Sequence, residues 1–357
     1  MLTGNKGEWS EIYTLFKVLS DQNLYGGDVD YNKVEKLIYP IIKIIRNEAS
    51  GDFEYELSGD IVIISGGLEQ IRFPIQTFTE QAGILLTKIK ESNGSFSSPE
   101  TEEFMSAIKC KSLKAKSTSK TDINIEIYDK RINQTAQLGF SIKSQLGGDS
   151  TLLNAGKTTN FIFRIDNFKG NAQDIKRINE ISSTSKIKDR LLEIQNLDGN
   201  LVFVGSENSM FNNNMILIDS LMPNLISEVI KQFYLTKMNT VKSLVETIAI
   251  LNPLNYDIQH SHTFYEFKVK KFLTDVALGM MPSKIWTGVY DASGGYLVVK
   301  SDGEVVCYHI YNRNIFEDYL YHNTRLETAS SSRHGFGKIY NEHGELYIKL
   351  NLQIRFS

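Results

Sequence analysis

Two strand-like segments separated by a polar break constrain most strongly what this chain can fold into. Apolar and polar side chains alternate in residues 123–128 (INIEIY), and a second short run follows at residues 138–143 (LGFSIK). Alternation with a period of two is typical of a strand with one buried face. Asp122 precedes the first run and Lys143 ends the second. We therefore expect two adjacent strands that bring a carboxylate and a lysine together at a sheet edge.

A carboxylate beside a lysine suits the metal-assisted hydrolysis of a phosphodiester. The carboxylate holds Mg²⁺, the metal neutralises charge on the phosphate, and the lysine orients or activates the attacking water. Asp122 could instead be an ordinary turn residue before a strand. For Lys143 a functional role is favoured, because a lysine in a buried strand seldom lacks a partner charge. Ser141 and Gln145 share its face of the strand and are expected beside the site.

A second carboxylate for the metal has two candidates. Glu126 lies four residues after Asp122, on the same strand face, although a solvent-facing position explains it equally well. Glu8 lies in the first turn of a predicted helix, where acids ordinarily complement the helix dipole. A Ser141–Lys143 nucleophilic pair is a remote alternative, because its spacing matches neither Ser-x-x-Lys nor Gly-x-Ser-x-Gly.

Composition indicates an ordinary globular protein of the cytoplasm. Of the 357 residues 41% are hydrophobic and 23% charged, and no apolar run approaches the ~20 residues that span a bilayer. The N-terminus lacks the pattern of a secretion signal, and the only cysteines are Cys110 and Cys307. The net charge of −3 does not favour nucleic acid, but residues 109–120 hold five lysines and no acid. The overall charge therefore decides nothing about the partner.

Several polar segments are candidates for contacts to DNA phosphates or base edges. Residues 156–159 (GKTT) superficially resemble a P-loop, but the full motif needs a glycine at position 151, which is threonine, so we expect no ATP binding. Serines beside an arginine, followed by glycines, suit close approach to DNA in residues 330–338. A flexible polar loop is the alternative for that segment. The predicted DNA contacts are Lys111, Lys114, Lys116, Thr151, Asn154, Asn160, Ser331, Ser332, Arg333 and His334.

Periodicity along the chain predicts a mixed α/β organisation in three parts. Helices are expected at residues 7–19, 78–89 and 101–107, a β-meander at 54–75, and either a helix or a strand broken by Pro40 at 34–45. A hairpin is expected at residues 296–308, around the turn at Asp302-Gly303. We predict an N-terminal α+β region over residues 1–105, a catalytic core over 106–255, and a β-rich part over 256–357.

Long segments of the chain resemble the HpaII-type family of type II restriction endonucleases. They are FSIKSQLG from residue 140, STLLNAGKTTNF from 150, SSSRHGFG from 330 and LNLQIRF from 350, with GNKGEWSE and GGYLVVKSDGEVVCYHIYNR adding to them. The similarity runs through essentially the whole chain. The strand pair is also similar to the PD-(D/E)xK nucleases, except that Ser141 stands where the second acid of that motif would be.

The resemblance implies a PD-(D/E)xK core, a mixed β-sheet flanked by helices, with a C-terminal DNA-recognition part. It implies Mg²⁺-dependent cleavage of double-stranded DNA at a short palindrome by a homodimer, with CCGG as the target of a member of this subfamily. Asp122 would be the metal-binding acid and Lys143 the catalytic lysine. The alternative is a sequence-specific DNA-binding protein whose nuclease site is degenerate, with Ser141 marking the loss.

Overall fold

The computed structural model describes residues 1–67, 69–114, 121–130 and 133–357. The chain forms two compact units, the first from residues 1–150 and 290–319 and the second from 151–289 and 320–357. These boundaries differ from the expected ones at 105 and 255. The reason is strand pairing, since strands from before residue 105 and a hairpin from after residue 290 join one sheet with the strands of the predicted core.

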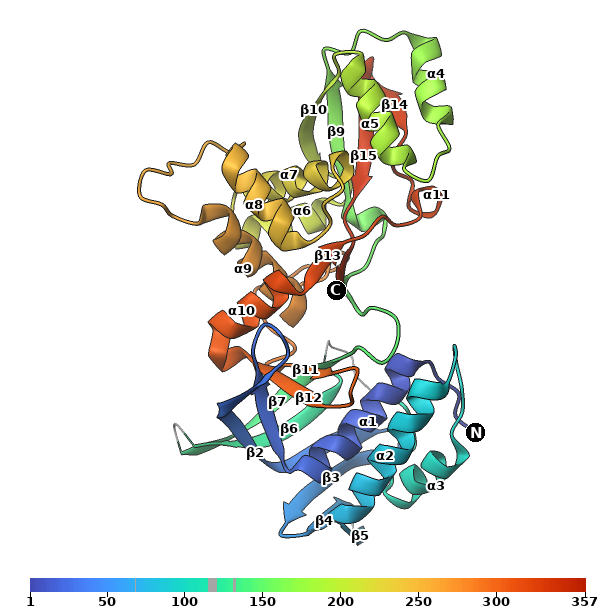
Figure 1. Ribbon diagram of the computed structural model, residues 1–357, viewed down its shortest axis with the longest axis vertical. Helices are drawn as coiled ribbons and strands as arrows, with labels where there is room; N and C mark the ends of the chain where they lie inside the picture. The colour runs from blue at the N-terminus through green and yellow to red at the C-terminus, as the bar shows by residue number, and fades with distance from the viewer. Residues whose placement is uncertain (68, 115–120, 131–132) are drawn as a thin grey trace. The chain divides into compact units, whose positions relative to one another are not determined.

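The first unit is built on a nine-stranded sheet in the order β1-β12-β11-β7-β6-β2-β3-β4-β5, with β1 pairing also to β2 (Figure 1). Most neighbours are antiparallel, but β11 runs parallel to β7 and β1 parallel to β12, so the sheet is mixed as predicted. The strands are β1 (Asn23–Gly27), β2 (Lys33–Glu48), β3 (Gly51–Ser58), β4 (Ile61–Gly66), β5 (Glu69–Pro74), β6 (Ile123–Asp129), β7 (Gln134–Ser144), β11 (Gly295–Val299) and β12 (Val305–His309).

The segment around Pro40 is a strand and not a helix. Pro40 lies opposite Asn23 of β1, close to where β2 begins to pair with β6 and β3. A proline cannot donate to a strand neighbour, so it is tolerated where the hydrogen-bonding partner changes. Sixteen residues can therefore form one strand that holds several neighbours together.

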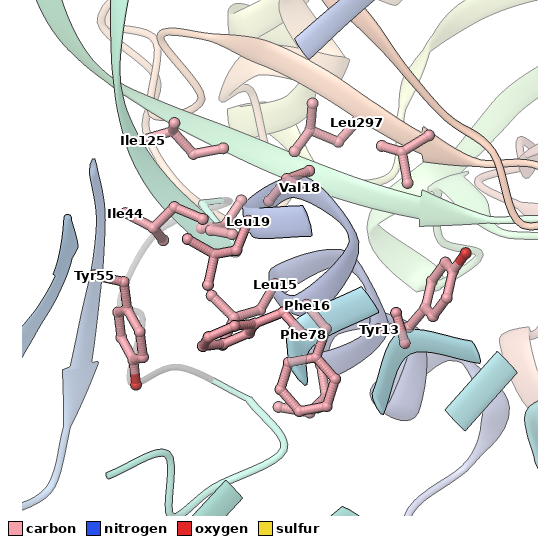
Figure 2. Close-up of a cluster of buried hydrophobic side chains, with 14 of the residues drawn as sticks. Tyr13, Leu15, Phe16, Val18, Leu19, Ile44, Tyr55, Phe78, Ile125 and Leu297 are labelled. Atoms are coloured by element: carbon pink, nitrogen blue, oxygen red, sulfur yellow. The ribbon is translucent and has the colours of Figure 1, made fainter. Parts of the chain in front are cut away.

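Three helices, α1 (Lys6–Asp21), α2 (Ile75–Glu91) and α3 (Pro99–Ala107), belong to the first unit. Figure 2 shows how α1 directs Phe16 and Leu19 toward Ile44 and Ile125 of the sheet, with Phe78 of α2 beside them. All five side chains are fully buried. Burial of each such side chain contributes ~1.5–3 kcal/mol relative to an exposed position. This packing fixes α1 against the strands that carry Asp122 and Lys143.

The hairpin of β11 and β12 is confirmed, but it lies in the sheet of the first unit and not in a separate recognition region. Leu297 of β11 pairs with Ile142 of β7 and with Cys307 of β12. All five residues of each strand are buried. Continuous apolar runs of this kind are typical of strands covered on both faces. The hairpin therefore completes the core around the Lys143 strand.

The second unit contains a four-stranded sheet in the order β10-β9-β15-β14, a three-stranded sheet in the order β13-β16-β8, and most of the remaining helices. Its strands are β8 (Thr151–Leu153), β9 (Asn160–Asp166), β10 (Asn200–Ser206), β13 (Thr324–Leu326), β14 (Ile339–Glu342), β15 (Glu345–Asn351) and β16 (Ile354–Phe356). Its helices are α4 (Ala172–Glu180), α5 (Lys186–Asn196), α6 (Ser209–Ile218), α7 (Met222–Leu235), α8 (Val241–Leu251), α9 (Phe264–Leu278) and α11 (Ser331–His334), while α10 (Arg313–His322) crosses the boundary between the units. Short 3₁₀ turns occur at Lys157–Thr159 and Ile310–Asn312. Among the described helices, none is long and apolar enough to cross a membrane.

Candidate nuclease site

Pairing of β6 with β7 fixes Asp122 beside Ser141. Ile123 lies opposite Phe140, and the Asp122 backbone N–H donates to the Phe140 carbonyl over 2.9 Å. The Oδ2 atom of Asp122 then accepts from the Ser141 hydroxyl at 3.0 Å and from the Ile142 backbone N–H at 2.7 Å. Two donors on one oxygen orient the carboxylate. Its Oδ1 accepts no hydrogen bond from the part of the chain that the structure describes.

Lys143 is half-buried near the end of β7, where its ammonium lies over the aromatic ring of Tyr296, 4.9 Å from the centroid. Burial lowers the pKa of Lys143, while the negative charges of Asp122 and Glu11 partly oppose that shift. The lysine thus lies within the electrostatic reach of two acids. A lysine with a lowered pKa is better able to exchange a proton near neutral pH.

Glu11 of α1 is a second glutamate near the start of that helix, and the choice from the sequence was Glu8 instead. Burial and the neighbouring charge of Asp122 raise its pKa to about 8, although Lys114 and Arg46 pull the other way. No described residue forms a hydrogen bond or ion pair with its carboxylate. Two acids close together disfavour each other's ionised form, and a cation between them would remove that penalty. Glu11 is therefore a stronger candidate than Glu8 for the second metal-binding carboxylate.

Glu8, the predicted supplier of that carboxylate, is engaged elsewhere. Its side chain accepts from the Asn5 backbone N–H at 2.8 Å, while Asn5 accepts from the Glu8 N–H, which completes a capping box at the start of α1. Lys114 also lies 3.1 Å from its Oε1. These contacts lower the pKa of Glu8, chiefly through the hydrogen bond to Asn5. Its position is explained by helix capping. The sequence signal for Glu11 was present too, one turn further along the helix, but only packing distinguishes the two glutamates.

Glu126 is likewise separated from the site. It lies opposite Lys43 of β2, and the two side chains form an ion pair at 3.6 Å. Four residues along a strand correspond to about 13 Å, so sharing a face with Asp122 does not bring the two carboxylates together. The ion pair with Lys43 and this spacing along the strand favour a structural role for Glu126, and its role as a metal ligand stays a prediction.

The two remaining predicted catalytic residues have defined contacts. Ser141 is buried and donates to Asp122, which makes it a positioning group for that carboxylate. Gln145 accepts from the Ser301 backbone N–H at 3.3 Å. The amide of Gln145 therefore packs against the turn between β11 and β12 and is not directed at Asp122.

Asp122 and Glu11 together fit the way in which proteins bind a small divalent cation. Magnesium is commonly held by one or two carboxylates, with water and substrate phosphates completing its coordination. No group of three metal-ligating side chains occurs among the described residues. A closed, all-protein cage of the kind found in structural metal sites is accordingly not formed by the chain that the structure describes. Two carboxylates with further positions left for phosphate are what the site offers.

The predicted DNA contacts of the second unit fall into two groups. Thr151 is half-buried and Asn154 is exposed. The helix α11 consists of Ser331, Ser332, Arg333 and His334, and none of these residues is buried. Asn160, in contrast, is completely buried. Its amide donates to Glu207 and to the His334 carbonyl, and its oxygen accepts from Asn351. The interior position of Asn160 argues against the predicted DNA contact and gives it a structural role in supporting α11.

The predicted lysine cluster lies partly outside the described residues. Lys116 and Lys120 belong to the segment 115–120, whereas Lys111 and Lys114 are exposed. Lys114 pairs with Glu8, and Lys109 pairs with Glu69 at 2.6 Å. These ion pairs reduce the positive charge that the described part of the cluster could offer to DNA.

Comparison with known proteins agrees with these features. The family model described as HpaII restriction endonuclease matches residues 5–356. The type II restriction enzyme HpaII of Haemophilus parainfluenzae is 48% identical over 358 aligned positions, which cover 99% of this chain and 98% of that enzyme. No solved structure matches the chain. Identity at this level over nearly the whole of both proteins shows the family, and the chain belongs to the HpaII restriction endonuclease family.

Proposed function

We propose that this chain is a type II restriction endonuclease that cuts double-stranded DNA at a short palindrome with the help of Mg²⁺, through a site made of Asp122, Glu11 and Lys143. The observation that carries the assignment of residues is their mutual electrostatic influence. Burial, and after it the charge of Asp122, raises the pKa of Glu11, while burial lowers the pKa of Lys143 and both acids counteract that lowering. A lysine and two acids on three adjacent elements form the minimum set for metal-assisted phosphodiester hydrolysis.

Each residue has a distinct role in this proposal. Asp122 and Glu11 would hold the divalent cation, which supplies charge neutralisation at the phosphate when bound. Ser141 and the Ile142 N–H fix one oxygen of Asp122 and leave the other for the cation. Lys143, with its lowered pKa, would orient the attacking water and take up its proton. The Tyr296 ring beneath Lys143 limits the positions that the ammonium can adopt.

The target CCGG and a homodimeric assembly complete the proposal. Both follow from the resemblance to HpaII-type enzymes, whose two identical subunits would each cut one strand of a palindrome. The 48% identity over the whole chain supports a shared target. Symmetric recognition would explain how a chain with a single proposed cleavage site cuts both strands.

A plasmid assay tests the proposal. Supercoiled plasmid that contains CCGG sites should be cut by the purified protein with Mg²⁺ into discrete fragments whose ends fall within CCGG, as read by sequencing the ends. The same plasmid with a chelator should remain intact. Discrete ends at another palindrome would reject only the target CCGG and leave the nuclease function in place. Sequence-specific binding without cleavage under any divalent metal would favour a DNA-binding protein whose nuclease site is degenerate.

A further inference from the structure

Two cavities of the second unit adjoin α11 and share lining residues. Their volumes are about 390 and 830 Å³, and both are lined by Lys186 and Ser331. The smaller cavity reaches Lys237, just beyond the end of α7. The larger cavity extends toward β14 and β15 and includes Lys349. Two cavities that share lining residues form one continuous hollowed surface, which we call the α11 groove.

The α11 groove is lined by basic side chains almost without acids. Lys186, Lys188 and Lys237 line the smaller cavity, and Lys186, Arg190, Lys338 and Lys349 line the larger. Glu180 is the one acid among these lining residues. The whole chain carries 39 basic and 42 acidic residues, so a surface with six basic groups and one acid departs sharply from its average. A groove lined by one sign of charge concentrates ligands of the opposite sign.

The positive charge of the groove is only partly cancelled by acids of the described chain. Lys186 and Lys338 form no ion pair with any residue that the structure describes, whereas Lys349 pairs with Glu207 at 2.8 Å. Arg190 is only 4% exposed, yet it donates to the carbonyl oxygens of Gly337, Asn179 and Ile181 and to no carboxylate of the described chain.

Burial lowers the pKa of Arg190, and no acid opposes that shift. Its Nε is buried without a hydrogen-bond partner among the described residues. A buried guanidinium without a counter-ion is costly and calls for an anion from outside.

We propose that the α11 groove binds the phosphate backbone of duplex DNA, with Lys186 and Lys338 as direct phosphate contacts and Arg190 as the fixed positive centre behind them. The inference rests on the proposed nuclease function for the identity of the anion. Lysine is a common point contact for phosphate, and such contacts position a protein on DNA without reading its sequence. Ser331, which lines both cavities, gives the groove a neutral donor between the cations.

The test compares two double variants that remove the same charge from the second unit. Lys186→Gln with Lys338→Gln changes one half-buried and one exposed lysine of the groove. Lys242→Gln with Lys284→Gln changes one half-buried and one exposed lysine outside both cavities, neither of which forms an ion pair with the described chain. Binding to a short duplex is measured by fluorescence anisotropy in chelator over a range of salt concentrations. Thermal melting checks that all proteins are folded.

In the groove variant the negative slope of log K against log[salt] should become shallower by about 1.8, because each of the two lost phosphate contacts contributes ~0.9 to its magnitude. The loss should be equal for duplexes with and without CCGG, since phosphate contacts carry no sequence information. The control variant should keep the wild-type slope. An unchanged slope in the groove variant, or an equal fall in both variants, would overturn the proposal.

The same proteins separate a failure of the groove from a failure of the proposed function. If the wild-type protein cuts plasmid and the groove variant binds with an unchanged slope, the groove is wrong and the nuclease stands. If the wild-type protein cuts nothing but the slope falls only in the groove variant, the groove stands and the nuclease is wrong.

Discussion

In the first unit, two acids and a lysine lie within reach of each other's charge, whereas in the second unit the charged side chains that line the α11 groove are basic except for Glu180. Acids and bases that lie close together in a partly buried site have shifted pKa values, and shifted pKa values suit groups that transfer protons. A single sign of charge instead attracts a polyanion without changing it. On the two proposals made above, chemistry and binding of the DNA backbone are carried by different units of this chain, so loss of one should leave the other in place.

The largest effect is expected from Lys143→Ala. Loss of a group that transfers a proton should lower the single-turnover rate of plasmid cleavage by about 10²–10⁴-fold. Binding to duplex DNA in chelator should change by less than threefold, since one lysine of the first unit adds little to the contacts of the groove. Lys36→Ala, at an exposed lysine of β2 in no ion pair with the described chain, is the matched control and should cut normally. Cleavage by Lys143→Ala at the wild-type rate would refute the site, and equal losses of binding and cleavage would refute the division between the units.

A smaller effect should distinguish two glutamates on one helix. Glu11→Gln removes a proposed metal-binding carboxylate and should reduce cleavage at limiting Mg²⁺ by about 10–100-fold, with partial recovery as Mg²⁺ is raised. Glu8→Gln should leave the dependence on Mg²⁺ unchanged. It should instead lower the free energy of unfolding by no more than about 0.2–1 kcal/mol, because glutamine still completes the capping box and only the ion pair with the exposed Lys114 is lost. Metal titrations of cleavage together with urea unfolding measure both quantities. If Glu8→Gln shifts the Mg²⁺ requirement and Glu11→Gln does not, the assignment from sequence was right after all.

The outcome for these glutamates indicates what the sequence could and could not predict. Periodicity predicted α1, the meander of β3 to β5, the pair β6–β7 and the hairpin β11–β12, because each depends on local pattern and turn residues. It could not predict that the hairpin pairs in parallel with β7, since nothing local encodes contacts between strands about 150 residues apart. The division of the chain at residues 289 and 290, which differs from the expected boundary at 255, depends on the same long-range pairing.

The candidate site shows the same division between what local pattern predicts and what long-range packing decides. Asp122, Ser141 and Lys143 were proposed together because adjacent strands of known phase place them near one another, and the hydrogen bond of Ser141 to Asp122 agrees with that phase. Glu8 was chosen instead of Glu11, because the place of Glu11 beside Asp122 depends on how α1 packs on the sheet. Asn160 was misjudged because a polar residue in a polar loop gives no sign that its amide will be buried between Glu207 and Asn351.

The smallest effect concerns the stability of the metal-free protein. Below pH 4.5 Glu11 is protonated in both the folded and the unfolded chain. Between pH 4.5 and about 8 the unfolded chain loses the proton while the folded chain keeps it, so the free energy of unfolding falls as the pH rises through this window. Glu11→Gln has no such titration. In chelator, the drop in Tm from pH 5.5 to pH 8 should therefore be a few degrees smaller in this variant than in the wild-type protein.

Magnesium extends the same reasoning to the ligand. A cation between Asp122 and Glu11 favours the ionised carboxylates, so binding should release a proton and tighten as the pH rises toward 8. Mg²⁺ should accordingly raise the Tm of the wild-type protein more at pH 8 than at pH 6, and raise that of Glu11→Gln less at both. Because Lys143 is present in both proteins, its titration contributes to the pH dependence of Tm in the wild-type protein and in Glu11→Gln alike. Equal stabilisation of both proteins at both pH values would mean that Glu11 holds no metal, and the first unit would then retain Asp122 as its single proposed ligand.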